Sequence, residues 1–122
     1  PLPVIPKTIA KSLAIGNPAD GYYAIKLAKE TRGSAHAVSD DEIVKGISLL
    51  ARTEGIFTET AGGVVIATLV KMVKQELISK DEEVVVLITG NGLKTQEVIS
   101  SLSAPTEINP TIKSFEDSFP NY

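Results

Sequence analysis

Cysteine and tryptophan are both absent from this chain of 122 residues, and histidine occurs once, as His36. The absence of cysteine excludes disulfides, a thiolate nucleophile and a zinc–thiolate site, and a single imidazole excludes a histidine-rich metal site. No stretch reaches the roughly 20 apolar residues that a membrane-spanning helix needs. The opening residues PLPVIP also lack the charged start and long apolar core of a signal peptide. We therefore expect a soluble, cytoplasmic protein with no membrane partner and no metal ligands.

A basic cluster is missing as well. The 12 lysines and arginines are spread among 15 acidic residues, and the net charge is −3. Without a basic patch the chain has no electrostatic footprint for nucleic acid. The hydrophobic content of 43% can bury one modest core. We expect one folded unit over residues 1–102, followed by an extended, proline-containing C-terminal tail at 103–122.

Two helix starts stand out in the first half of the chain. Asn17 can cap a helix and Pro18 suits its first turn, and Gly33 is placed to end it. The sequence SDDE at 39–42 has the pattern of a capping box, in which a serine and a glutamate satisfy each other's free amides. Apolar residues at helical spacing then continue to Gly55. Both segments are predicted to be helices.

The second half mixes helical and extended patterns. The helix predicted at 64–77 is apolar on nearly every side at its start, so we expect its first turns to be buried, and 94–102 can form a last helix. Strands are predicted at 34–38, 56–59 and 84–89, and the unbroken apolar run of the third suits a parallel strand covered on both faces. The predicted fold class is α/β with three layers: a mainly parallel sheet with flanking helices.

A hydroxyl and two glycines follow the most apolar run in the chain. Thr89, Gly90, Asn91 and Gly92 come directly after VVVLI, where ligands of open α/β sheets bind. Glycine allows positive backbone angles and close approach of a ligand to the main chain. Two interpretations are open on spacing alone: a ligand contact, or a simple turn from strand to helix. The spacing fits neither the phosphate loop nor the dinucleotide fingerprint.

Four phrases in order carry a resemblance. ITGNGLK at 88–94, ETAGG at 59–63, IGNPA at 15–19 and LARTEGIF at 50–57 resemble the C-terminal part of the threonine synthase family. This resemblance implies a portion of the tryptophan synthase β-like fold of pyridoxal-phosphate enzymes (fold type II). It also implies a homodimeric lyase that converts O-phosphohomoserine and water to L-threonine and phosphate, cleaving a carbon–oxygen bond.

The resemblance also assigns roles to cofactor-binding residues. Thr89 is similar to the family hydroxyl that hydrogen-bonds the pyridine nitrogen of the cofactor, and Gly90 and Asn91 belong to the same turn. Glu59 resembles a family glutamate close to the cofactor ring, and a plain surface carboxylate is an equal alternative. Thr60 stands where the family more often has proline, so we expect a looser turn at this point.

The resemblance places the Schiff-base lysine and the glycine-rich phosphate-binding loop in an N-terminal part that has no counterpart among these residues. None of the lysine contexts matches the nucleophile segment, so no catalytic residue is assigned and the chain alone is predicted to be inactive. We expect the missing N-terminal part of the enzyme as its partner. Two alternatives stay open: a piece of a related threonine or serine dehydratase, and a non-catalytic α/β module that binds an anion or a partner.

Overall fold

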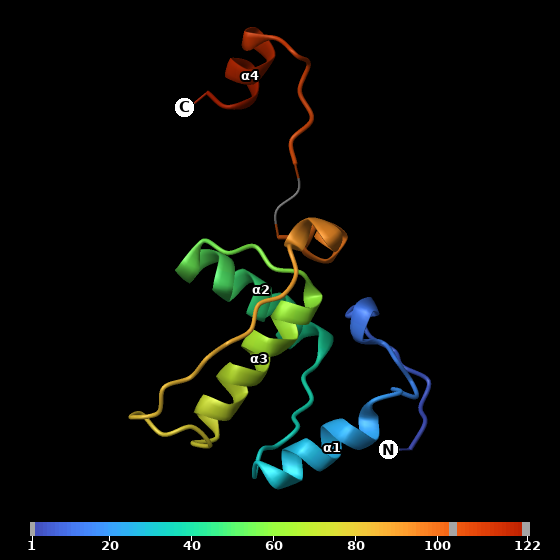
Figure 1. Cartoon of the computed structure of the whole chain (residues 1–122). Coiled ribbons are helices and arrows are strands. Elements are labelled where there is room, and N and C mark those ends of the chain that lie inside the picture. Colours follow the sequence, from blue (N-terminus) through green and yellow to red (C-terminus); the bar gives the residue numbers. More distant parts are fainter. Residues whose placement is uncertain (1, 103–104, 121–122) are drawn as a thin grey trace.

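Helices dominate the computed structural model, which describes residues 2–102 and 105–120 (Figure 1). Within these residues α2 and α3 pack against each other and form the centre of the molecule. None of the described helices is both long and apolar enough to cross a membrane. The helices are α1 (Gly21–Glu30), α2 (Asp40–Glu54), α3 (Thr60–Lys74) and α4 (Ile112–Ser118), with short 3-10 helices η1 (Lys11–Leu13), η2 (Gly92–Lys94) and η3 (Gln96–Ile99).

The capping box sets the start of α2, as predicted. The Ser39 hydroxyl accepts a hydrogen bond from the Glu42 amide at 3.3 Å, and the Ser39 amide donates to the Glu42 carboxylate at 2.6 Å. Gly55 ends the helix in the left-handed region at φ 68°, which glycine adopts without strain. The buried side chains of Ile43 and Ile47 join Ala10 of the N-terminal segment in the hydrophobic core. The sequence therefore predicted both ends of α2 correctly.

Glycines inside α3 bring it close to α2. A methyl group on Gly46 of α2 would lie 2.5 Å from the carbonyl oxygen of Gly63, and one on Gly63 would lie 2.8 Å from that of Ile43. Hydrogen in place of a side chain thus lets the two backbones touch. The first turns of α3 are buried, as predicted, and the helix begins at Thr60 instead of 64. Glycine disfavours a helix interior only mildly, and here the packing outweighs that cost.

The helix α1 forms, and the sequence misplaced its ends. It starts at Gly21, with Asp20 at the N-cap making no side-chain bond, so Asn17 is not its cap. At the other end Arg32, not Gly33, takes the left-handed conformation, with φ 55°. The amide of Gly33 then donates to the Ala28 carbonyl at 2.7 Å, which closes the last turn. This helix buries none of its residues.

The predicted parallel sheet is not confirmed. The described residues form one isolated antiparallel bridge, between Thr58 and Asn91, and no ladder at 34–38 or 84–89. The run at 84–89 has no neighbouring strand in the described part of the chain, and Val85 and Leu87 are 85% and 71% exposed. A strand exists only where a neighbour accepts its amide hydrogens, so an apolar pattern alone does not produce a sheet.

The last third of the chain also differs from the prediction. In place of the α-helix predicted at 94–102, the chain forms the 3-10 helices η2 and η3, which end at Lys94 and Ile99. The expected extended tail at 103–122 contains α4, in which Thr111 caps the helix and the rings of Phe115 and Phe119 lie 5.1 Å apart. Residues 103, 104, 121 and 122 lie outside the described residues, and a domain boundary at 102 stays a prediction. Figure 1 shows α4 standing apart from α2 and α3.

Candidate functional site

The turn at 90–95 is bonded to the residues that lead into α3. The Thr58 hydroxyl and the Glu59 amide both donate to the Gly90 carbonyl, at 3.0 and 3.1 Å. The Gly92 amide donates to the Phe57 carbonyl at 3.0 Å. These bonds join segments about 32 residues apart in the sequence. The TGNGLK motif is thereby held against the start of α3, and this pair of segments is the candidate functional site.

Gly90 and Gly92 are needed for close approach. A methyl group on Gly90 would collide with the Glu59 carboxylate, and one on Gly92 would collide with the Phe57 ring. Among the described glycines only Gly55 has a positive φ, so close approach and not a positive backbone angle is what requires glycine at 90 and 92. Two glycines flank Asn91 because each lies directly under a side chain of the facing segment.

Glu59 is the only charged residue that is buried within residues 2–102 and 105–120. It is 8% exposed, and its carboxylate lies 3.8 Å from the Lys94 ammonium group, whose side chain is 66% exposed. The pair is long and half in water, so it contributes at most about 1 kcal/mol. The structure thus contradicts the alternative of a surface carboxylate. Lys94 faces solvent at the rim of the site and partly neutralises Glu59.

Thr60 is the residue that replaces the family's more frequent proline, and the structure gives it a distinct role. Its amide donates to the Thr95 hydroxyl oxygen at 3.3 Å, a bond that proline lacks the hydrogen to make. This bond ties the Glu59 turn to residue 95, so the structure does not support the expectation of a looser turn. The Thr60 hydroxyl oxygen is buried without a hydrogen-bond partner among the described residues. A buried hydroxyl that makes no hydrogen bond lowers the stability of the folded chain, unless a group outside the described residues bonds it.

The four predicted cofactor-binding residues fall into two groups. Gly90, Asn91 and Glu59 come together, and Asn91 uses its side-chain oxygen to accept from the Leu93 amide at 2.9 Å. Thr89 lies at the end of the extended run, and its side chain is exposed. The structure therefore brings Gly90, Asn91 and Glu59 together, and contact of any of the four residues with a cofactor stays a prediction. Sequence reasoning missed Thr58 and Thr95, which carry no motif beyond a hydroxyl.

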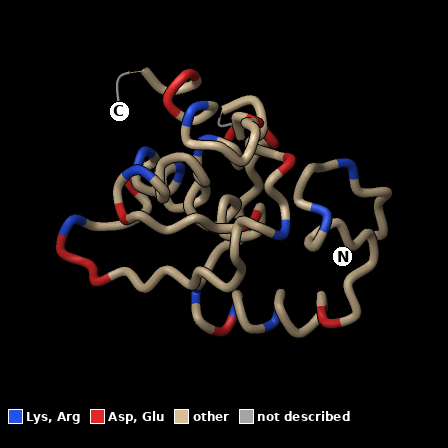
Figure 2. The backbone as a smooth tube through the Cα atoms, turned by 90° about the horizontal axis from the view of Figure 1, so that it is seen from above, with Lys and Arg blue, Asp and Glu red and all other residues tan. Residues whose placement is uncertain are grey.

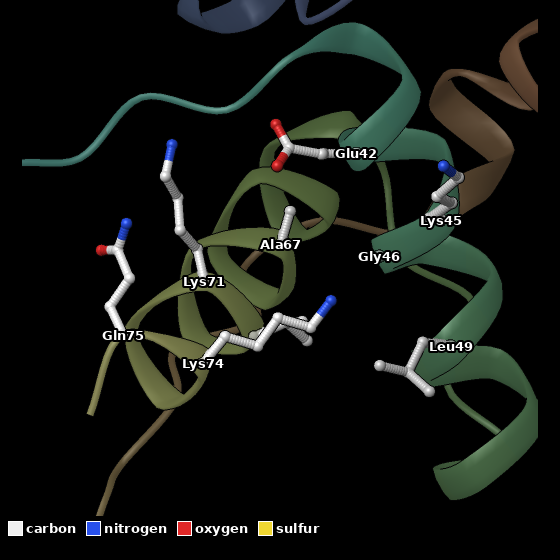
Figure 3. A pocket seen from close by; sticks show the side chains of 9 residues that line it. Glu42, Lys45, Gly46, Leu49, Ala67, Lys71, Lys74 and Gln75 are labelled. Atoms are coloured by element: carbon white, nitrogen blue, oxygen red, sulfur yellow. The ribbon is translucent and has the colours of Figure 1, made fainter. Parts of the chain in front are cut away.

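No group of three or more histidine or acidic side chains gathers into a metal site within residues 2–102 and 105–120. Figure 2 shows basic and acidic residues interspersed along the backbone. A cleft between α2 and α3 lies elsewhere (Figure 3) and shares no lining residue with the Glu59–Gly90 contact. The candidate site is consequently an open edge of the chain, with Thr89 and Lys94 facing outwards.

Comparison with known proteins identifies the class. Residues 2–90 match the family described as "Pyridoxal-phosphate dependent enzyme", and the chain belongs to that family. Its cofactor is pyridoxal phosphate.

More specifically, the chain is similar to threonine synthases. It is 43% identical to that of Bacillus sp. (strain ULM1) over 79% of the chain and 27% of the relative. It is 40% identical to that of Halalkalibacterium halodurans over 88% of the chain and 29% of the relative. It is 45% identical to that of Methanocaldococcus jannaschii over 73% of the chain and 22% of the relative. The chain thus spans about a quarter of the length of these relatives.

The residues present fit one edge of pyridoxal phosphate. The exposed Thr89 hydroxyl can donate a hydrogen bond to a ring nitrogen. Thr89 is next to Gly90, whose lack of a side chain leaves room for the Glu59 carboxylate. The lysines near this edge do not converge on it: Lys94 is paired with Glu59 and largely exposed. An exposed hydroxyl is compatible with the ring-nitrogen side of the cofactor, and contact of Thr89 with that nitrogen stays a prediction.

Proposed function

We propose that this chain is the C-terminal portion of a threonine synthase, which converts O-phosphohomoserine and water to L-threonine and phosphate. The observation that carries the proposal is the packing of the TGNGLK turn against Glu59, with Gly90 directly beneath the carboxylate. Two of the four phrases that resemble the family, at 59–63 and 88–94, meet at this point. Similarity to named threonine synthases at 40 to 45% identity supports the same assignment.

In this proposal Thr89 donates its hydroxyl hydrogen to the pyridine nitrogen of the cofactor, whose ring supplies an electron sink for the reaction. A hydroxyl leaves that nitrogen without a full positive charge, so the ring withdraws electrons less strongly than beside an aspartate. Glu59 lies beside Gly90, the residue after Thr89, and its burial keeps its carboxylate in one place. Asn91 holds the turn through its bond to the Leu93 amide.

The proposal also accounts for the uncovered apolar run at 84–89. In the complete enzyme it is a strand of a mainly parallel sheet, paired with strands from the N-terminal part of the protein. That part supplies the Schiff-base lysine and the phosphate-binding loop, so this chain alone is inactive. A homodimer and a cytoplasmic location complete the proposal.

The test is the substitution Thr89→Val in the complete enzyme. In this chain by itself Thr89 is exposed, so here the change should alter stability by less than about 0.5 kcal/mol. Loss of a hydrogen bond to the cofactor costs on the order of 1–3 kcal/mol, which slows turnover by roughly ten- to a hundredfold. Thr89→Ser is the matched control and should retain most activity. Unchanged turnover and an unchanged cofactor absorbance spectrum in Thr89→Val would refute the role of Thr89.

Substrate choice separates the proposal from a related dehydratase. The complete enzyme should release phosphate from O-phosphohomoserine and should not deaminate threonine or serine. The isolated chain with cofactor should release no phosphate above background. Borohydride reduction followed by peptide mapping checks this point, because one stoichiometrically modified lysine together with turnover would contradict it.

A further inference from the structure

Thr58 is fully buried between the two segments of the candidate functional site. Its hydroxyl donates to the Gly90 carbonyl at 3.0 Å, and the Glu59 amide donates to the same oxygen at 3.1 Å. Because a carbonyl oxygen has two lone pairs, these two bonds use its full capacity to accept hydrogen bonds. A side chain and the backbone amide that follows it therefore hold Gly90 together.

The first turn of α3 keeps the Thr58 side chain in place. A methyl group on Gly62 would collide with the Thr58 hydroxyl and would lie 2.8 and 2.9 Å from its Cβ and Cγ2 atoms. Thr58 therefore packs directly on the backbone of α3. A β-branched side chain that is fully buried has little freedom to change its χ1 rotamer. Thr58 thus links α3 to Gly90 through a side chain that cannot move far.

This link does not depend on what covers the chain in a longer protein. Thr58 has no exposed surface in this chain alone, and Gly62 is buried as well. While these elements keep their arrangement, further protein packed on them can only reduce their exposure. The contact is therefore a property of these residues themselves.

We propose that Thr58 is a positioning residue for Thr89, whose hydroxyl it places by holding the Gly90 carbonyl against α3. Thr89 and Gly90 share a planar peptide bond, so a shift of Gly90 moves Thr89 with it. Reactions depend steeply on the placement of the groups that take part in them. Thr58 acts through Thr89 and not on the cofactor, because its buried hydroxyl already donates to a carbonyl. This role rests on the one proposed above for Thr89.

The substitutions Thr58→Ser and Thr58→Ala in the complete enzyme isolate the hydroxyl. Both remove the γ-methyl group and neither adds atoms next to Gly62, so they differ only in the bond to Gly90. Thr58→Ser should retain turnover within about twofold, and Thr58→Ala should be roughly three- to tenfold slower than Thr58→Ser, as for one hydrogen bond. The control Thr31→Val removes a hydroxyl that donates to the Leu27 carbonyl at the end of α1, and should leave turnover unchanged. Equal turnover of the two Thr58 variants would overturn the proposal.

The background Thr89→Val separates positioning from general support of the fold. Without the Thr89 hydroxyl there is nothing for Thr58 to place, so Thr58→Ser and Thr58→Ala should then have the same turnover within about twofold. If Thr58→Ala were slower by the same factor in both backgrounds, Thr58 would only support the fold and the proposal would be wrong. If Thr89→Val alone left turnover unchanged, the role of Thr89 would be refuted, and the role of Thr58 with it.

Amide hydrogen exchange in the cofactor-free enzyme measures the contact without any reaction. The Gly92 amide donates to the Phe57 carbonyl at 3.0 Å across the same pair of segments. It should exchange roughly three- to tenfold faster in Thr58→Ala than in Thr58→Ser, because loss of the bond to Gly90 lets the contact open more often. Equal exchange rates would show that the Thr58 hydroxyl does not hold Gly90, and would overturn the proposal even with a difference in turnover.

Discussion

Replacing Gly90 with alanine is the most direct test of how the site is built. The added methyl group would collide with the carboxyl group of Glu59 and lie 2.6 Å from its Cγ atom. Because the stem of the side chain is blocked as well as its tip, Glu59 must leave its position. It then loses the contact with Lys94, and the backbone bond between the Glu59 amide and the Gly90 carbonyl is strained.

The expected cost follows from these contacts. Overpacking costs about 1–3 kcal/mol, and the exposed ion pair adds at most about 1 kcal/mol. Alanine recovers about 0.4–1 kcal/mol by restricting the unfolded chain. We therefore expect Gly90→Ala to destabilise this chain by about 2 kcal/mol, measured by urea denaturation followed by circular dichroism.

A double-mutant cycle makes the reasoning refutable. In a Glu59→Ala background the methyl group has no carboxylate to meet, so Gly90→Ala should cost less than about 0.5 kcal/mol there. The control Gly33→Ala should be nearly neutral, because its methyl group would find its nearest neighbour, the Thr31 hydroxyl, at 3.2 Å. If Gly90→Ala cost the same with and without the Glu59 side chain, the proposed close approach would be wrong.

Three further predictions concern the α2–α3 pair. Gly46→Ala places a methyl group against the Gly63 carbonyl, which cannot rotate away, so denaturation should show a net loss of about 1–2 kcal/mol despite better helix propensity. Ile43→Ala should cost about 2–5 kcal/mol in the same assay, since Ile43 is fully buried. The hydrogen bonds from Ser39 lower the pKa of Glu42 below its ordinary value of 4.5. The resulting stability is present above pH 4.5 and lost as the pH falls through the lowered pKa, and melting curves of Glu42→Gln should lack this dependence.

Local signals in the sequence predicted the helices better than the sheet. The capping box and Gly55 set the two ends of α2 through contacts within a few residues, so they hold in any surroundings. The start of α3 was misjudged because Gly62 and Gly63 look like a turn in sequence, whereas in the structure Gly63 packs against Ile43 and Ile47 of α2 and Gly62 packs against Thr58. A strand at 84–89 depends on a neighbour, and no local pattern can supply one.

The sequence identified residues of the candidate site but not the hydrogen bonds that join them. The motif at 88–94 and Glu59 were identified from the sequence, and the structure places Gly90 against Glu59. The bond from the Thr60 amide to Thr95 was not foreseeable, because a hydroxyl acceptor for one particular amide leaves no periodic or spacing signal. The sequence also left open why glycine stands at 90 and 92, since close approach and positive φ both favour glycine and only coordinates tell them apart.

The uncovered run VVVLI at 84–88 has a consequence for how this chain behaves in concentrated solution. Five consecutive apolar residues, most of them β-branched and none charged, form the kind of segment that stacks into cross-β fibrils when its backbone amides have no native partner. Val85 and Leu87 are exposed on the extended backbone, so copies of the chain can add to one another edge to edge. Any protein segment that packs over residues 84–88 therefore also protects the chain from amyloid-like assembly.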